Sequence, residues 1–202
     1  MTPKIALALF LLPACSSSSD SDSEPDTHSE TDSGSDTQTQ PAPIQLSSPD
    51  FENENEIPLT HACTTKGGDN TSPEISIASI PLETGSLALI MDDEDSPCGT
   101  GASACRHWAL FGLPADTNSL PQNPNIEDFA GATQGLNYTG STGYVGPCPP
   151  NQHTYKFTVF ALDSAAPAVA NESVYTRSTF EEAYQEHILS MATLEGWFNP
   201  TP

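Results

Sequence analysis

The chain has 202 residues and a formal net charge of −22 at pH 7, with 27 acidic residues against 5 lysines and arginines. This balance argues against nucleic acid as a partner, because binding to phosphate backbones requires clustered Lys and Arg side chains. Residues 44–202 are enough for one globular domain with a sizeable interior.

The first 15 residues are typical of a secretory signal peptide. Lys4 precedes an apolar stretch from Ile5 to Leu12, which is too short to remain as a membrane-spanning helix. The following "LPAC" resembles a bacterial lipobox, whose cysteine, here Cys15, becomes lipidated and is then the first residue of the mature protein. We therefore expect an extracytoplasmic protein, lipid-anchored to a bacterial membrane in the periplasm or at the cell surface. An ordinary secreted protein is the alternative.

Residues 16–43 form a second segment, rich in Ser, Thr, Asp and Glu and without an aliphatic residue beyond Ala42. Such a sequence buries too little apolar surface to offset the entropy of ordering it, and its like charges extend it. It predicts a disordered acidic tether that holds the domain at 44–202 away from a membrane.

Cysteine usage supports an oxidising compartment. Without Cys15, the chain keeps an even number of cysteines, which predicts two disulfides. Three connectivities are possible, and the spacing favours a local bridge, with the two distant residues left to each other: Cys98 with Cys105 and Cys63 with Cys148. A zinc site is the alternative, but the sequence has no CxxC pair, so we expect no metal.

Three apolar runs, each followed by turn-forming residues, predict β-strands at 86–92, 107–114 and 155–163. In the last run, period-two alternation places one set of residues on each face, and both sets are largely apolar: Tyr155, Phe157, Val159 and Ala161 on one face, and Lys156, Thr158, Phe160 and Leu162 on the other. This strand should therefore be central in its sheet.

One helix is predicted from residue 178 onward. Ser178 and Glu181 have capping-box spacing, apolar residues recur at helical intervals as far as Met191, and Gly196 would end the helix. His187 lies on the apolar stripe, which favours a structural role for it. The pattern alone predicts a mostly β domain with a C-terminal helix packed on one side.

Polar residues gather where the predicted strands begin or end. Loops held there by a rigid sheet are common places for binding sites. These segments contain eight candidates: Asp93, Asp95, Pro97, His107, Gly146, Pro147, His153 and Tyr155.

Four motifs in order carry a resemblance to a known family. They are "CTTKGGDNTSPEIS" at 63–76, "DEDSP" at 93–97, "HW" at 107–108 and "GPCPPNQHTY" at 146–155. From about residue 44 to 198 the chain resembles the phosphatidylethanolamine-binding protein family, in its bacterial Raf kinase inhibitor-like branch. The family writes the second motif DPDAP, so Glu94 and Ser96 are departures, and the aromatic residue that usually follows the SP segment is absent.

The resemblance implies a β-sandwich with a C-terminal helix, few other short helices, and a small pocket for anions such as phosphate or the phosphoethanolamine head group. It maps that pocket to the eight candidates above. We expect Asp93 and Asp95 to orient the imidazoles of His107 and His153 and to favour their cationic forms. Backbone N–H groups at the Gly146 turn would add donors.

The phosphate of a zwitterionic head group would then meet the histidines and Tyr155, and its ammonium would meet a carboxylate. Asp92 and Glu94 alternate with the pocket acids and should face solvent or cap the turn.

The leading functional hypothesis is a membrane-tethered binding module without a cofactor. The first alternative is a protein-interaction role, such as inhibition of an envelope protease, because the resemblance includes inhibitors of kinases and proteases. The second is an enzyme that uses the carboxylates and histidines for hydrolysis or metal binding. The sequence contains neither a nucleophile elbow nor an HExxH motif to support the second.

Overall fold

The computed structural model describes residues 43–200. The predicted signal peptide, Cys15 and nearly all of the predicted tether lie outside this range. The described chain contains nine strands: β1 Gln45–Ser47, β2 Asn55–Glu56, β3 Ile75–Ala78, β4 Thr84–Asp93, β5 Cys105–Pro114, β6 Ser119–Leu120, β7 Thr133–Gln134, β8 His153–Asp163 and β9 Ile188–Phe198. It also contains helix α1 at Arg177–Tyr184 and four 3-10 turns at Leu59–His61, Thr64–Lys66, Gly101–Ser103 and Ile126–Asp128.

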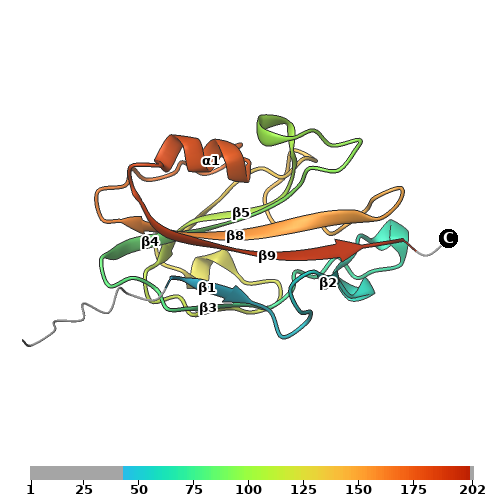
Figure 1. Ribbon diagram of the computed structural model, residues 1–202, viewed down its shortest axis with the longest axis horizontal. Coiled ribbons are helices and arrows are strands. Elements are labelled where there is room, and N and C mark those ends of the chain that lie inside the picture. Colours follow the sequence, from blue (N-terminus) through green and yellow to red (C-terminus); the bar gives the residue numbers. More distant parts are fainter. Residues whose placement is uncertain (1–42, 201–202) are drawn as a thin grey trace, which may run out of the picture. The chain divides into compact units, whose positions relative to one another are not determined.

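The strands form two sheets. Six strands pair in the order β2-β9-β8-β4-β5-β7, and three short strands pair in the order β1-β3-β6. All pairs are antiparallel except β2 with β9. In Figure 1, α1 covers one face of the large sheet, and β1 and β3 lie across its other face. The predicted mostly β, sandwich-like architecture is confirmed.

Two cores fill the spaces on either side of the large sheet, and β8 contributes to both. Tyr155, Phe157, Val159 and Ala161 point into the core between the sheets. Phe160 and Leu162 point into a smaller core beneath α1. The predicted division of this strand into two covered faces is therefore confirmed, and β8 lies between β9 and β4 inside the sheet.

The predicted long helix is wrong in its second half. The N-cap of helix α1 is Thr176, two residues before the expected Ser178, and it forms a capping box with Thr179; the helix ends at Tyr184. From Ile188 the chain is strand β9, paired with β8 along its length. Gly196 does not end a helix: it allows close packing, since a Cβ there would lie 2.6 Å from Ile57 Cγ1. Within residues 43–200, no helix is long and apolar enough to cross a bilayer.

Asp92 anchors α1 to the large sheet, contrary to the expectation that it faces solvent. Its side chain is only 1% exposed, and its carboxylate accepts hydrogen bonds from the backbone N–H of Arg177 at 2.9 Å and from Arg177 Nε at 3.0 Å. Burial raises the pKa of Asp92, and the guanidinium opposes that shift. Glu94 accepts from Arg177 Nη2 and from the Gly101 N–H, so it does cap the turn after β4.

Replacing Arg177 with Ala should therefore destabilise the domain strongly at pH 7. The Asp92 carboxylate would stay buried without its cation, which typically costs about 3 kcal/mol or more. Urea-induced unfolding would measure the loss. Lys156→Ala is the matched control, because its ion pair with Glu94 is about one-third exposed and should contribute at most about 1 kcal/mol. Equal losses in the two variants would contradict the anchoring role of Asp92.

Candidate ligand-binding site

The register of three neighbouring strands builds the site. Asp93, at the end of β4, lies opposite Cys105 on β5 and Tyr155 on β8. Residues two apart on a strand share a face, so His153 lies beside Tyr155 on the same face of the sheet. The "DEDSP", "HW" and "GPCPPNQHTY" segments therefore meet at one end of the sheet.

A β-bulge in β5 explains how the two adjacent residues of the "HW" motif can both point to the same face of the large sheet. Met91 pairs with Trp108, but Asp92 pairs with Arg106, so His107 is the extra residue. A bulge of this kind re-aims a side chain locally. Trp108 enters the core between the sheets, while His107 lines the cavity at its end.

We call this space the strand-end cavity, and its volume is about 140 Å³. Pockets for drug-sized ligands span about 300–1,000 Å³, so this one suits a single small group. Five of the eight predicted residues line it, together with six that were not predicted as ligand-binding: Asp93, Pro97, His107, His153 and Tyr155, and Cys98, Cys105, Tyr138, Cys148, Pro149 and Pro150.

A buried acid–imidazole pair forms the floor of the cavity. His153 Nδ1 lies 2.7 Å from Asp93 Oδ2, and Asp93 Oδ1 accepts the N–H of Asp95 at 2.8 Å. The carboxylate thus orients His153 as expected. Burial raises the pKa of Asp93, although the hydrogen bond from His153 opposes the shift.

Two polar atoms in this floor lack a protein partner. His153 Nε2 and the Tyr155 hydroxyl are buried, and neither forms a hydrogen bond within the described chain. Such groups are rare in folded proteins, because an unpaired buried polar atom costs about 1–3 kcal/mol. Both residues line the strand-end cavity, where a ligand could pair with them.

His107 is held differently from the prediction. Its Nδ1 lies 2.7 Å from the Val145 carbonyl, and its own carbonyl accepts the Val145 N–H at 2.9 Å, so the imidazole is oriented by backbone and not by Asp95. Burial lowers the pKa of His107 to about 4. The expected cationic His107 is therefore wrong, and the ring is neutral at physiological pH.

The tautomer of His107 follows from this contact. A carbonyl oxygen can only accept, so Nδ1 carries the proton and Nε2 of the neutral ring is an acceptor. The ring is packed between Tyr138 and Tyr155, with ring centroids 5.0 Å from each. His107 is thus fixed in both orientation and proton position.

Three predicted residues lie outside the lining of the strand-end cavity. Asp95 is exposed, and its Oδ2 accepts the N–H of Thr154 at 2.6 Å. The Gly146 N–H, expected to face a ligand, instead donates to Asn70 Oδ1 at 2.8 Å. The Pro147 carbonyl accepts the Cys63 N–H at 2.9 Å. These residues position the surrounding loops.

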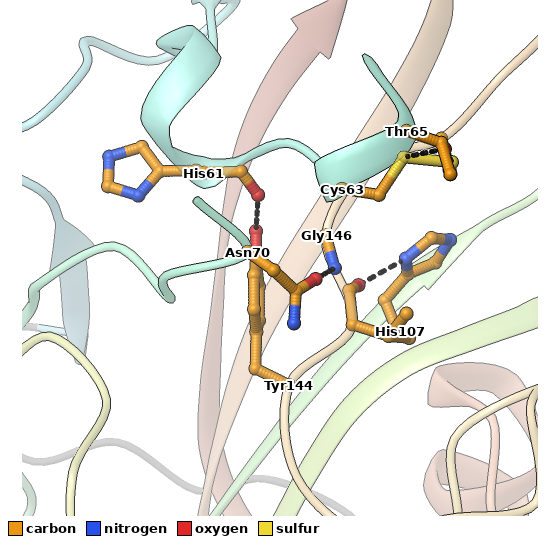
Figure 2. The surroundings of a disulfide bond; sticks show 9 residues. His61, Cys63, Thr65, Asn70, His107, Tyr144 and Gly146 are labelled. Atoms are coloured by element: carbon orange, nitrogen blue, oxygen red, sulfur yellow. Dashed lines mark hydrogen bonds between the residues drawn. A yellow bond between two sulfur atoms is a disulfide. The ribbon is translucent and has the colours of Figure 1, made fainter. Parts of the chain in front are cut away.

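Gly146 is required by a close approach between two loops. A Cβ at this position would lie 2.2 Å from the His61 carbonyl oxygen, a backbone atom that cannot yield easily. The Tyr144 hydroxyl also donates to this carbonyl, at 2.9 Å. Figure 2 shows Asn70, Tyr144 and the His107 ring converging on this junction. The "CTTKGGDNTSP" segment therefore acts as a clamp on the "GPCPP" loop.

Both expected disulfides are present. Cys63–Cys148 joins the clamp to the "GPCPP" loop across 85 residues, and the Thr65 hydroxyl lies 3.0 Å from each of its sulfur atoms (Figure 2). Cys98–Cys105 closes the turn between β4 and β5. Three of these cysteines line the strand-end cavity, so the disulfides form part of its wall.

Sequence reasoning missed Tyr138 as a wall residue. It is partly exposed, follows β7 in an irregular segment and is placed by its backbone N–H, which donates to the Arg106 carbonyl at 2.7 Å. No local pattern signals this. Pro149 and Pro150, by contrast, lie within the quoted "GPCPPNQHTY" motif.

Asp93, Asp95 and His153 also form a cluster whose potential ligand atoms lie within 4.8 Å of one another. Their present hydrogen bonds already engage both Asp93 oxygens, His153 Nδ1 and one Asp95 oxygen. A metal ion here would have to share carboxylate oxygens that already accept hydrogen bonds, whereas His153 Nε2 is unpaired within the described chain.

Comparison with known proteins agrees with the geometry. The model of the phosphatidylethanolamine-binding protein family matches residues 47–199. The chain belongs to this family. A UPF0098 protein of Methanothermobacter thermautotrophicus is 36% identical over 154 residues, which cover 73% of this chain and 93% of that protein. One from Aquifex aeolicus is 34% identical over 155 residues, covering 73% and 86%.

Solved structures of family homologues have the same fold. The putative phosphatidylethanolamine-binding protein homologue CT736 of Chlamydia trachomatis aligns with a TM-score of 0.65 at 31% identity, covering 79% of this chain and 99% of that one. YbcL of E. coli, described as a new member of the mammalian family, aligns with a TM-score of 0.67 at 26% identity, covering 79% and 100%.

The buried neutral His107 should make the stability of this family member depend on pH. The unfolded imidazole has a pKa of about 6.5, against about 4 when folded, so between these values the unfolded chain binds more protons. The His107 contribution is complete above pH 6.5 and is lost as the pH falls towards 4, by up to about 3 kcal/mol.

Urea-induced unfolding at several pH values would measure this, with His107→Asn as the reference variant. The asparagine amide can still donate to the Val145 carbonyl but does not titrate. The wild type should lose stability relative to this variant as the pH falls from 6.5 to 4. Parallel profiles for the two proteins would contradict the depressed pKa.

Proposed function

We propose that this member of the phosphatidylethanolamine-binding protein family binds a small anion, phosphate or a phosphorylated head group, in the strand-end cavity. One observation carries the proposal: His153 Nε2 and the Tyr155 hydroxyl are buried, unpaired within the described chain and part of the cavity lining. A phosphate oxygen would accept from the Tyr155 hydroxyl and would satisfy this otherwise costly group. The family's name supports a ligand with a phosphorylated head group.

The volume and wall of the cavity support a small ligand. About 140 Å³ is space for one compact polar group, and the prolines and disulfides around it give a rigid boundary. A larger molecule would place only its head group inside. Because His153 Nδ1 faces Asp93, its Nε2 is an acceptor in the neutral ring and becomes a donor only when the ring takes up a further proton from solvent or from the ligand.

Tyr155→Phe is the decisive variant, because it removes one oxygen atom and keeps the ring. Isothermal titration with inorganic phosphate should show affinity weakened about tenfold or more, the usual effect of losing a hydrogen bond to a charged group. Thermal stability should stay equal or rise slightly, since the lost hydroxyl has no protein partner. Unchanged affinity would remove Tyr155 from the site.

Tyr184→Phe provides the matched control. Its hydroxyl donates to the Pro167 carbonyl at 3.2 Å, and its ring lies in the core beneath α1. We expect a stability loss of about 1 kcal/mol with unchanged phosphate affinity. The opposite responses of these two buried tyrosines would separate binding from folding.

We also propose that the domain acts outside the cytoplasm, attached to a membrane through lipidated Cys15. The support is the lipobox-like "LPAC" sequence, together with two disulfides in the described chain, which are typical of oxidising compartments. Net negative charge disfavours attachment to anionic lipid by charge alone, so the acyl chains would supply it.

Cys15→Ala should move the protein from the membrane fraction to the soluble fraction of a bacterial host and abolish the acyl mass on its N-terminal peptide. The double variant Cys98→Ser, Cys105→Ser is the control, because it removes cysteines without touching the lipobox, and its folded fraction should remain with the membrane. A Cys15→Ala protein that stays in the membrane fraction would contradict lipid anchoring.

A further inference from the structure

The Cys98–Cys105 disulfide forms one wall of the strand-end cavity, together with the neighbouring Pro97. We propose that this disulfide is a redox switch of the anion site. The oxidised protein binds phosphate, and reduction of the bridge to two thiols weakens binding while the domain stays folded. The inference rests on the proposed function and adds a means of regulating the same site.

One carboxylate oxygen connects the disulfide to the groups that would meet the anion. Asp93 Oδ2 lies 2.7 Å from His153 Nδ1 and 3.8 Å from Cys98 Sγ. A disulfide sulfur carries no proton, so of these two neighbours only the imidazole donates to the oxygen in the oxidised protein. After reduction, Cys98 is a thiol, and a thiol is a weak hydrogen-bond donor. Reduction therefore adds a second donor at the oxygen that orients His153.

The second donor acts against anion binding. His153 Nε2 donates only when the ring is protonated, and the adjacent carboxylate favours that form. A thiol that donates to Asp93 stabilises the carboxylate by itself, so the carboxylate favours the imidazolium less. The thiol keeps its proton near neutral pH, because a neighbouring negative charge raises the pKa of a cysteine. In the reduced protein an anion therefore meets the neutral imidazole, whose Nε2 is an acceptor.

Of the two disulfides in the described chain, Cys98–Cys105 is the more open to a reductant. Both of its cysteines are partly exposed and line the cavity. In the other bridge Cys63 is buried, with 8% of its surface exposed. A small dithiol in solution can therefore reach the local bridge first.

The switching reaction is thiol–disulfide exchange with a dithiol. One thiolate of the dithiol attacks a sulfur of the bridge, the S–S bond breaks, and the second thiolate then resolves the mixed disulfide. Two electrons pass to the cysteines, which take up two protons and become thiols, and the dithiol is oxidised to its own disulfide. The same exchange in reverse closes the bridge.

The turn that carries the bridge has support of its own. The Gly99 N–H donates to the Ser103 carbonyl at 3.1 Å within the turn. The bridge joins residues only 7 apart in sequence, against 85 for Cys63–Cys148, and a shorter closed loop stabilises a folded chain less. Opening the local bridge should therefore leave the domain folded, with Cys63–Cys148 as its structural crosslink.

Isothermal titration with inorganic phosphate is the test, on the oxidised protein and on protein reduced by the lowest dithiothreitol concentration that opens the local bridge. Affinity should weaken at least about fivefold on reduction, as for the loss of one modest hydrogen bond, and re-oxidation should restore it. Alkylation with peptide mass spectrometry would identify Cys98 and Cys105 as the thiols formed. Circular dichroism would show that the reduced domain is folded.

Two double variants separate the added donor from the lost covalent bond. In Cys98→Ser with Cys105→Ser, the hydroxyl at position 98 takes the place of the thiol donor. Cys98→Ala with Cys105→Ala is the matched control, because it opens the wall without adding a donor. The serine variant should bind phosphate as weakly as the reduced protein, and the alanine variant should bind it more tightly than the serine variant. Equal affinities in the two variants would overturn the role of the donor at Asp93.

The remaining outcomes are distinguishable. Phosphate affinities within about twofold of each other in the oxidised and reduced protein would overturn the switch and leave the anion site standing. Unfolding when only Cys98–Cys105 is reduced would also overturn the switch, because the bridge would then be a structural crosslink. Failure of both forms to bind phosphate would overturn the proposed function and the switch with it. If the serine variant does not fold, the comparison of oxidised and reduced wild type still decides the question.

Discussion

The antiparallel register of β4 against β5 and β8 is the constraint on which the site depends. It places Asp93 beside Cys105 and Tyr155, and the bulge at His107 turns that ring towards the same space. Side chains alternate between faces along a strand, so a slip of one residue would send Asp93 towards α1 and Asp92 into the cavity. The two cores, one on each face, resist such a slip because it would expose apolar side chains on both sides.

The alternation of faces along β4 explains why four acids can follow one another at residues 92–95. Asp92 points to α1 and holds Arg177, whereas Asp93 points to the cavity and holds His153. Glu94 and Asp95 then fix the following turn and the start of β8 through the N–H groups of Gly101 and Thr154. Four neighbouring carboxylates are tolerated because each has its own donors, which offset mutual repulsion and burial.

Sequence patterns predicted three of the nine described strands, β4, β5 and β8, because the signals of these long strands are local. The two-sided alternation of 155–162 reflects burial on both faces, and the motif order located the strand ends. The helix prediction failed after Tyr184 because apolar residues occupy both faces of β9, including the exposed Met191, which hides its period of two. Pairing with β8 overrides the helical spacing.

The chemistry of the site was less predictable, since it depends on contacts distant in sequence. The proton position on His107 is set by Val145, 38 residues away, and the donor at Gly146 is consumed by Asn70, 76 residues away. A histidine beside carboxylates in the sequence suggests a cation. Burial against two tyrosines reverses that expectation for His107, because desolvation outweighs any distant negative charge.

The electrostatics of the whole molecule also bear on the charge of the ligand. With a net charge of −22, the protein repels an approaching anion, and repulsion grows with the anion's charge. A fixed cation could offset this field, but both ion-paired cations near the site, Lys156 and Arg177, are bound to carboxylates outside the cavity lining. A ligand with less negative charge would also be repelled less strongly by the protein. The acidic surface and the Asp93 carboxylate in the cavity lining thus both favour a ligand of low negative charge.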